Sequence, residues 1–421
     1  MEFIKRISSA AAAITAAALL GSCGYMANTD KSIIVTDKPQ VTKITFFGNK
    51  YKETNVKVID DIIKGFMKKN PGIEVKYEGL KGGEYYEVLR KRMETGNGDD
   101  VFVVDSDTMR ILENNHQLAD LSGASVIQKY SDLVKNQITN SDGTVYMLPT
   151  TVSMFGLYCN MDLLKEHNKA VPQNMSEFED TCEYFKQQGM TPLVANNDDS
   201  LKVIAYGRGF YDYYKNGEAE DIINKVNSGE EKLSTYLRPG FEKAEEFIKK
   251  GYVNSEETLN SYRASDDLKL FERGNSPFMI CGAWAEPRLA DEAPNLNFSV
   301  YPLPVLDDGS VVVINPGVRL AVNENSKHKE EAIKFVEYFT EEENINKFSD
   351  EQCSLNPIKN SRLPAVKHIQ PLVEAYKDKQ VVIGSDTRFN APIWDYGMEI
   401  SRGLLMGKPL DELMNRLDEQ K

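Results

Sequence analysis

Short apolar runs and helical repeats of apolar residues alternate along the chain. The first apolar run after residue 40 is 43–47, which predicts a buried strand. Apolar residues at helical spacing follow it and stop at Asn70-Pro71-Gly72, which predicts a helix with a defined end. These apolar residues are Val56, Ile59, Ile62, Ile63 and Phe66. A second strand is predicted directly afterwards, at 73–77.

The same alternation continues to the end of the chain. It predicts helices at about 85–95, 107–115, 176–188, 239–250, 265–273, 393–406 and 410–417. Strands are predicted at 101–104, 154–159 and 277–281, with an extended segment at 143–149. Strands that alternate with helices are typical of a parallel sheet covered by helices, so the predicted fold class is α/β.

The N-terminal segment has the pattern of an export signal. Lys5 and Arg6 precede the apolar run 7–20, which is shorter than the ~20 residues that span a membrane. The sequence Leu-Gly-Ser-Cys that ends at Cys23 resembles a bacterial lipobox, which implies cleavage after residue 22 and lipidation of Cys23. The alternative is an ordinary secretory signal with an incidental cysteine. Residues 24–40 are polar and aperiodic, so we expect a flexible tether.

Length and charge restrict the class of protein. About 380 residues remain after the signal and tether, more than one hydrophobic core usually organises, so two domains are expected. The net charge is −14, and removal of residues 1–22, with Lys5, Arg6 and Glu2, changes it to −15. Lys and Arg are scattered among acidic residues, so we expect no nucleic-acid partner.

Catalytic, metal and nucleotide motifs are missing from the sequence. The cysteines after Cys23 have no C-x-x-C spacing, and a disulfide is not indicated; they are Cys159, Cys182, Cys281 and Cys353. The histidines are isolated in hydrophilic contexts and are expected at the surface; they are His116, His167, His328 and His368. Asp307-Asp308-Gly309 predicts a turn, because the ligand spacing of a calcium loop is missing. We therefore expect no cofactor, no metal and no catalytic residue.

Several segments together carry a resemblance to a known family. In chain order they are ITFFGNK at 44–50, FMKKNPGIEV at 66–75, DVFVV at 100–104, DGTVYMLP at 142–149, LYCN at 157–160, FERG at 271–274, ICGAW at 280–284, NPGVR at 315–319 and SKHKEEAIKF at 326–335. In this order and behind a lipobox, they resemble the family 1 extracellular solute-binding proteins, of which the maltose-binding protein is the best-known example. The resemblance covers residues 41–421.

The resemblance implies a type II periplasmic-binding fold, in which two α/β lobes are joined by three hinge segments and enclose a ligand cleft. Its hinge segments are expected near 150–153, 310–315 and 360–366. The first lobe would comprise 41–150 with 311–362, and the second 151–310 with 363–421.

The resemblance also places ligand-binding residues at the matching positions. They are Asn49, Lys50, Asp105, Asp107, Ser153, Asp199, Trp284 and Trp394. Six of them have an alternative role: Asn49 and Lys50 as loop surface, Asp105 and Asp107 as helix N-caps, and both Trp as core packing. Asn315 and Arg319 lie near a crossing and are expected to hold the hinge rather than the ligand.

These residue types suit a carbohydrate. A sugar ring has an apolar face that an indole matches, and its hydroxyls find partners in carboxylates, amides and Lys. The sequence is therefore interpreted as a monomeric, lipid-anchored protein on the extracellular face of a bacterial cytoplasmic membrane, which delivers a carbohydrate to the permease subunits of an ABC importer. Two alternatives stay open: a secreted glycan-active enzyme that uses a pair such as Asp105 and Glu286, and a receptor that presents its sugar to a sensor kinase.

Overall fold

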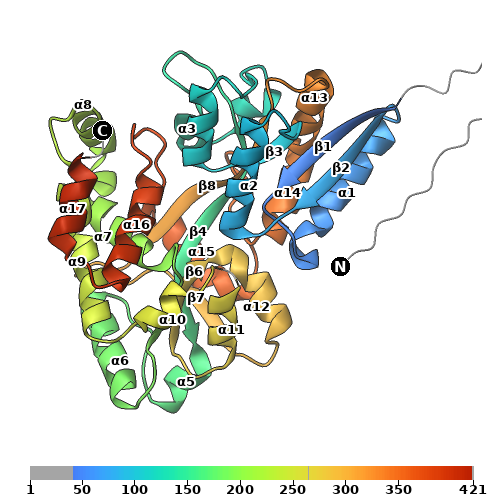
Figure 1. The fold of residues 1–421 in the computed structure, drawn as a ribbon. Coiled ribbons are helices and arrows are strands. Elements are labelled where there is room, and N and C mark those ends of the chain that lie inside the picture. Colours follow the sequence, from blue (N-terminus) through green and yellow to red (C-terminus); the bar gives the residue numbers. More distant parts are fainter. Residues whose placement is uncertain (1–40, 264, 420–421) are drawn as a thin grey trace, which may run out of the picture. The chain divides into compact units, whose positions relative to one another are not determined.

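The computed structural model describes residues 41–263 and 265–419. The predicted export signal, Cys23 and the tether lie outside the described residues. Figure 1 shows the described chain as helices packed around a sheet. Among the helices of this part, none is long and apolar enough to cross a membrane.

The first lobe is built by the predicted strand–helix alternation. The parallel strands β1 (Thr42–Gly48), β2 (Ile73–Gly79) and β3 (Val101–Val104) alternate with the helices α1 (Glu53–Lys69), α2 (Gly82–Glu94) and α3 (Ser106–Asn114). The apolar positions predicted for the first helix lie inside α1. The α/β prediction for this part of the chain is confirmed.

All strands of the described residues belong to one sheet, in the order β2-β1-β3-β8-β4-β6-β5. Its central strands are β4 (Leu148–Asn160) and β8 (Val312–Val322), which pair antiparallel. The strands of the second lobe are β5 (Leu193–Val194), β6 (Phe278–Gly282) and β7 (Phe298–Tyr301), while β9 (Val381–Ile383) pairs with β8. Because β8 pairs with β9 at one end and with β3 at the other, it connects the two lobes.

The β4–β8 ladder is interrupted where the lobes meet. Pro149 pairs with Arg319 and Thr151 with Gly317, but Thr150 and Val318 between them are not paired. The Thr150 hydroxyl donates a 2.8 Å hydrogen bond to the Val318 carbonyl. Val318 has a φ of 41°, which a β-branched residue rarely adopts. The crossing expected near 150–153 lies within β4, and the crossing expected near 310–315 lies at the start of β8.

The third connection follows α13 (Lys329–Phe339) and α14 (Glu342–Glu351), which pack against α1 in the first lobe. The chain then reaches α15 (Gln370–Lys377) beside β7 in the second lobe, after the short helix η3 (Lys367–Ile369). The crossing predicted near 360–366 lies in this connection. The exact lobe boundaries stay a prediction.

Helices form most of the second lobe and lie to the left and bottom of Figure 1. They are α5 (Met161–Glu166), α6 (Met175–Gln187), α7 (Ser200–Asn216), α8 (Ala219–Ser228), α9 (Leu233–Lys249), α10 (Ser255–Leu259), α11 (Asp266–Glu272), α12 (Glu286–Glu292), α16 (Ile393–Leu405) and α17 (Leu410–Glu419). The short helices η1 (Ser125–Lys129), α4 (Asp132–Ile138) and η2 (Ala283–Ala285) complete the chain. α9 begins six residues before the predicted start, and Pro239 lies inside it.

The core lies on both faces of the sheet. Successive side chains of β4 point to opposite faces. Met154 and Tyr158 belong to the buried apolar cluster on one face, and Phe155 and Leu157 belong to the cluster on the other. This follows from the two-residue period of a strand. A strand that is buried on both faces holds the hinge region in a fixed register.

Candidate ligand-binding site

A cavity of about 380 Å³ lies between residues of the two lobes. The loops after β1, β3 and β6 contribute to its wall. Open α/β sheets bind ligands at the carboxyl ends of their strands, and the volume lies within the ~300–1,000 Å³ of small-molecule sites. The position and size of the cavity both suit a ligand.

Seven of the eight residues predicted for the ligand site line this cavity. They are Asn49, Lys50, Asp105, Asp107, Ser153, Trp284 and Trp394. Asp199 is not among the lining residues and is fully buried, whereas its neighbour Asp198 lines the wall. Asn315 and Arg319, which were expected only to hold the hinge, also line the cavity.

The two indoles meet on a shared aromatic side chain. Phe155 on β4 contacts Trp284 edge to face at a centroid distance of 4.9 Å, and contacts Trp394 at 5.5 Å. Both Trp side chains are only half-buried, so the role of pure core packing does not describe them. The three rings form an aromatic floor of the cavity.

Each indole lies against a glycine that makes room for it. A Cβ on Gly282 would lie 2.0 Å from Trp284, and a Cβ on Gly384 would lie 2.7 Å from Trp394. Gly282 has an ordinary extended backbone, so the ring and not the chain conformation requires glycine there. Any side chain at these positions would push the indole away from its place.

Two side chains of the helix α7 pack against the Trp394 ring. Lys202 is fully buried, and its Nζ lies 4.1 Å from the centroid of the Trp394 ring. The Tyr206 ring, one turn further on, stacks on Trp394 at 5.5 Å. A buried cation–π contact stabilises by about 2 kcal/mol, so Lys202 fixes the indole as well as packing beneath it.

Lys202 is compensated by two carboxylates at the start of α7. Its Nζ lies 2.7 Å from Asp198 and 3.6 Å from Asp199, and Arg263 bonds both acids from the other side. Burial disfavours the charged form of Asp198, but Lys202 and Arg263 outweigh this and hold its pKa below the usual range. Asp199 thus has a structural role behind the wall.

Asp105, Asp107 and Asp395 also line the cavity and are close enough to interact electrostatically. Asp105 caps α3 by accepting a 2.7 Å hydrogen bond from the Thr108 N–H, as its alternative role predicted, while Asp107 lies inside the first turn. Burial first, and then the neighbouring Asp395 and Asp105, raise the pKa of Asp107 to about 7. Asp107 therefore presents a hydroxyl donor or a carboxylate acceptor near neutral pH.

The loop after β1 brings an amide and an amine to the cavity. Asn49 Nδ2 donates to the Tyr86 hydroxyl at 3.4 Å, while its buried Oδ1 has no hydrogen-bond partner within the described residues. Burial, and then the nearby Arg263, lower the pKa of Lys50 to about 8. Both groups are placed to bond a polar ligand.

Asn315 and Arg319 also tie the hinge strand to its surroundings. Asn315 accepts a 2.7 Å hydrogen bond from the Ser385 N–H. Arg319 donates to the hydroxyls of Ser106 at 2.8 Å and Ser385 at 3.3 Å. Because both residues also line the cavity, a movement of β8 at the hinge would shift groups that can contact a bound ligand.

Residues 52–345 match the family model described as bacterial extracellular solute-binding protein. The chain belongs to this family. A multiple sugar-binding protein of Streptococcus mutans is 24% identical over 407 residues, which cover 91% of this chain and 90% of that protein. A maltooligosaccharide ABC transporter solute-binding lipoprotein of Streptococcus pneumoniae is 23% identical over 391 residues, which cover 90% of this chain and 84% of that protein.

Solved structures share the fold of this solute-binding protein. The raffinose complex of the solute-binding protein RafE matches with a TM-score of 0.71 at 20% identity, over 90% of this chain and 98% of that one. A Bacillus licheniformis sugar transporter in complex with stachyose matches with a TM-score of 0.69 at 18% identity, over 90% of this chain and 99% of that one. The predicted two-lobed fold is thereby confirmed.

The carboxylate pair considered for an enzyme was Asp105 and Glu286, and of these two only Asp105 lines the cavity of this solute-binding protein. Glu286 is buried and is not among the residues that line the cavity. It contacts His368 Nδ1 at 2.6 Å and accepts a 3.2 Å hydrogen bond from Cys353. His368 also stacks on Phe298, so it has packed partners that its hydrophilic sequence context does not indicate. Its sequence neighbours could not reveal partners on distant segments.

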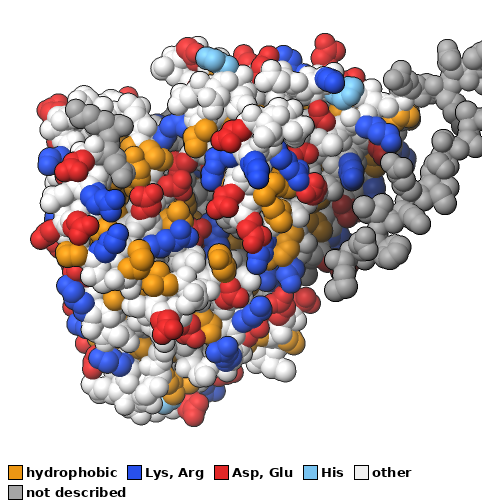
Figure 2. Space-filling model, in the orientation of Figure 1, with side chains coloured by type: hydrophobic (Ala, Val, Ile, Leu, Met, Phe, Trp, Pro, Cys, Tyr) orange, Lys and Arg blue, Asp and Glu red, His pale blue; other side chains and the backbone are white. Residues whose placement is uncertain are grey.

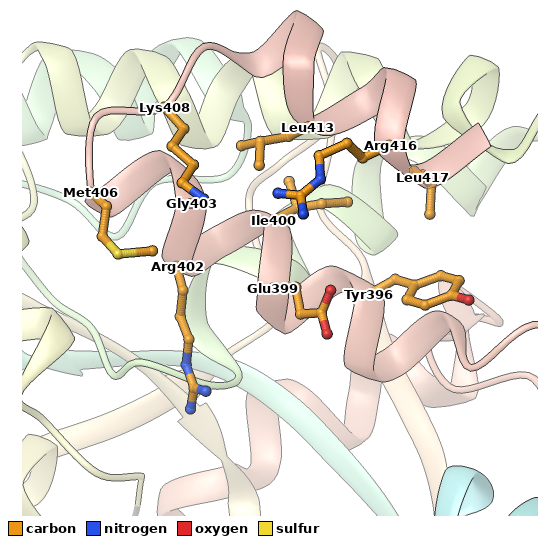
Figure 3. Close-up of a pocket in the computed structure, with 10 residues that line it drawn as sticks. All are labelled: Tyr396, Glu399, Ile400, Arg402, Gly403, Met406, Lys408, Leu413, Arg416 and Leu417. Carbon is orange, nitrogen blue, oxygen red and sulfur yellow. The ribbon is translucent and has the colours of Figure 1, made fainter. Parts of the chain in front are cut away.

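A second hollow, of about 250 Å³, lies between α16 and α17 (Figure 3). Its wall combines aliphatic side chains such as Ile400 and Leu413 with Arg416 and Lys408. Arg402 points away from Leu413 and Leu417 in Figure 3, and also lines the larger cavity. Only the C-terminal helices line this hollow, so hinge motion would not act on it directly.

Metal and disulfide chemistry find no support in the described part of the chain. It contains no group of His, Cys, Asp and Glu suited to a metal ion. Cys159, Cys182, Cys281 and Cys353 are buried and unbridged.

Sequence reasoning missed several residues that line or support the cavity. They are Tyr86, Phe155, Lys202, Arg263 and Asp395. Lys202 carried a signal, because a Lys within the apolar run that follows Asp198 and Asp199 requires a buried partner. The others are brought in by tertiary packing and have no local signature.

Proposed function

We propose that this solute-binding protein captures a carbohydrate between its lobes and delivers it to the permease of an ABC importer. The observation that carries the proposal is the placement of the only two Trp of the sequence on the wall of one cavity, between carboxylates and cationic groups. Indoles cover the apolar face of a sugar, and the charged groups bond its hydroxyls. The names of the relatives, a multiple sugar-binding protein and a maltooligosaccharide-binding lipoprotein, support the same ligand class.

Binding is proposed to act through hinge closure. A ligand that contacts both lobes stabilises the closed state by the free energy of the contacts that only this state makes. The proposed lobes are 41–150 with 311–362, and 151–310 with 363–421. The unpaired Thr150 and Val318 in the β4–β8 ladder support a pivot at this level of the strands.

We further propose that the protein acts as a monomer, held by a lipid on Cys23 at the outer face of the cytoplasmic membrane. The lipobox pattern and the lipoprotein relatives support this location. A nucleic-acid partner is not expected. Lys and Arg are interspersed with Asp and Glu over the face drawn in Figure 2.

A thermal-shift screen of the purified protein against mono- and oligosaccharides tests the proposal. A ligand that binds the folded state raises the melting temperature with its concentration, by RT ln(1 + [L]/Kd) in free energy. We expect such stabilisation by at least one sugar and no change in that sugar after incubation. Failure of every sugar to stabilise the protein would contradict carbohydrate binding, and release of cleavage products would favour an enzyme.

A further inference from the structure

Two exposed aromatic residues lie on the wall of the ligand cavity. Large hydrophobic side chains that are exposed within the described residues are Val41, Tyr51, Ile111, Tyr262 and Met406. The two aromatic members, Tyr51 at 37% and Tyr262 at 59% exposure, both line the same cavity. One exposed aromatic residue needs no explanation, but two at one cavity indicate a surface that another molecule covers.

The segments that carry these two residues both approach the turn after β2. A Cβ on Gly79 would lie 2.0 Å from the Lys50 carbonyl oxygen and 3.2 Å from the Tyr51 Cα, so the loop after β1 rests on the loop after β2. Lys81, two residues further on, places its Nζ 5.6 Å from the centroid of the Tyr262 ring. Tyr51 of the proposed first lobe and Tyr262 of the proposed second lobe thus both lie close to the segment 79–81.

These tyrosines differ from the aromatic floor in their surroundings. Trp284 and Trp394 pack edge to face or tilted on Phe155, and Trp394 also stacks on Tyr206. Neither Tyr51 nor Tyr262 makes a ring contact with another aromatic side chain of the described chain. The cation–π partners of their rings are the amines of Lys52 and Lys81, at 6.0 and 5.6 Å from the ring centroids, and both side chains remain exposed.

The polar groups beside them suit sugar hydroxyls. Lys81, Glu84 and Glu87 line the same stretch of cavity from the start of α2. Tyrosine combines a flat apolar face with a hydroxyl at low conformational cost, which makes it suited to contacts that are partly in water. An aromatic face with an amine and carboxylates beside it repeats the chemistry of the floor.

We propose that Tyr51, Tyr262 and Lys81 form an outer subsite, which holds a sugar unit beyond those that contact Trp284 and Trp394. The ligand is then an oligosaccharide that extends beyond the aromatic floor. This inference rests on the proposed carbohydrate function and adds chain length to it.

Isothermal titration calorimetry with sugars of increasing length tests the subsite. Suitable probes are sucrose, raffinose and stachyose, and maltose, maltotriose and maltotetraose, because each series extends one core. Tyr262→Ala should weaken binding of the three- and four-unit sugars about tenfold and change binding of the two-unit sugar less than about twofold. Tyr262→Phe should retain most of the affinity, because it keeps the ring.

Tyr211→Ala is the matched control. Tyr211 is half-buried on α7, carries the amine of Lys215 at 5.3 Å from its ring and does not line the cavity. This variant should bind all sugars like the wild type. Equal loss for short and long sugars in Tyr262→Ala, or no loss at all, would overturn the outer subsite while leaving carbohydrate binding intact. Absence of binding by the wild type to any sugar would instead overturn the proposed function and this inference with it.

Discussion

Gly282→Ala perturbs the aromatic floor without removing a ring. The added Cβ would lie 2.0 Å from Trp284 Cη2, whereas ordinary contact begins at 3.4 Å, so the indole must retreat from its position beside Phe155. The backbone of Gly282, with φ −75° and ψ 151°, accepts alanine without strain. The three atoms nearest to the added methyl all belong to Trp284, so the substitution acts first on the placement of this indole.

The expected loss follows from what the indole contributes. Truncation of a well-packed aromatic anchor costs about 2 kcal/mol of binding free energy, or roughly thirtyfold in Kd. We expect Gly282→Ala to lose a similar amount for the sugar found in the thermal-shift screen. Gly309→Ala, where a Cβ would meet nothing within 4 Å, is the control and should bind normally.

A double-mutant cycle with Trp284→Ala gives the sharpest form of this prediction. If Gly282 acts only by making room for the indole, then Gly282→Ala/Trp284→Ala should bind no more weakly than Trp284→Ala alone. Calorimetric Kd values for the four proteins measure the coupling. Additive losses in the cycle, or an unchanged Kd in Gly282→Ala, would refute the assignment of Trp284 to the floor.

Three further variants test other parts of the account. Burial and the neighbouring Asp395 and Asp105 raise the pKa of Asp107 to about 7. The stability that its bound proton provides is therefore present below about pH 4 and is lost as the pH rises through 7. Asp107→Asn should raise the melting temperature more at pH 8 than at pH 5, and equal shifts at the two pH values would contradict this. Val318→Gly relieves a φ of 41° and should change the unfolding free energy by less than about 1 kcal/mol, whereas a loss of more than about 2 kcal/mol in urea unfolding would argue against backbone strain at the hinge. Cys23→Ser should release the folded protein from membranes in a fractionation assay, and continued detergent-dependent association would refute the lipid anchor.

Local sequence patterns were sufficient for the first lobe. The strands β1 to β3 and the helix α1 follow directly from short apolar runs and from apolar residues at helical spacing. The second lobe was harder, because α7 is buried on most sides and its apolar residues show no single face. β4 was divided into two segments for a related reason: its buried polar residues Thr150 and Thr151 resemble a loop but lie within a strand.

The candidate site was predicted where a residue directly follows a strand. Asn49 and Asp105 are such residues, Trp284 lies two residues after the end of β6, and each of the three lines the cavity. Lys202 and Arg263 were not predicted from the sequence, because their roles depend on ion pairs with Asp198 and Asp199 that form only in the folded chain. The assignment of Asp199 rather than Asp198 reflects the same limit, since sequence alone could not tell which acid of the pair faces the ligand.

Tryptophan fluorescence tests the central claim most directly. The sequence contains only two Trp, Trp284 and Trp394, and both line the cavity, so every emission change reports on this site. Saturation with the sugar that stabilises the protein should alter the emission and reduce quenching by acrylamide in the wild type, in Trp284→Phe and in Trp394→Phe. If calorimetry detects sugar binding while the emission and quenching of all three proteins stay unchanged, the ligand binds elsewhere. That result would contradict a sugar site at Trp284 and Trp394.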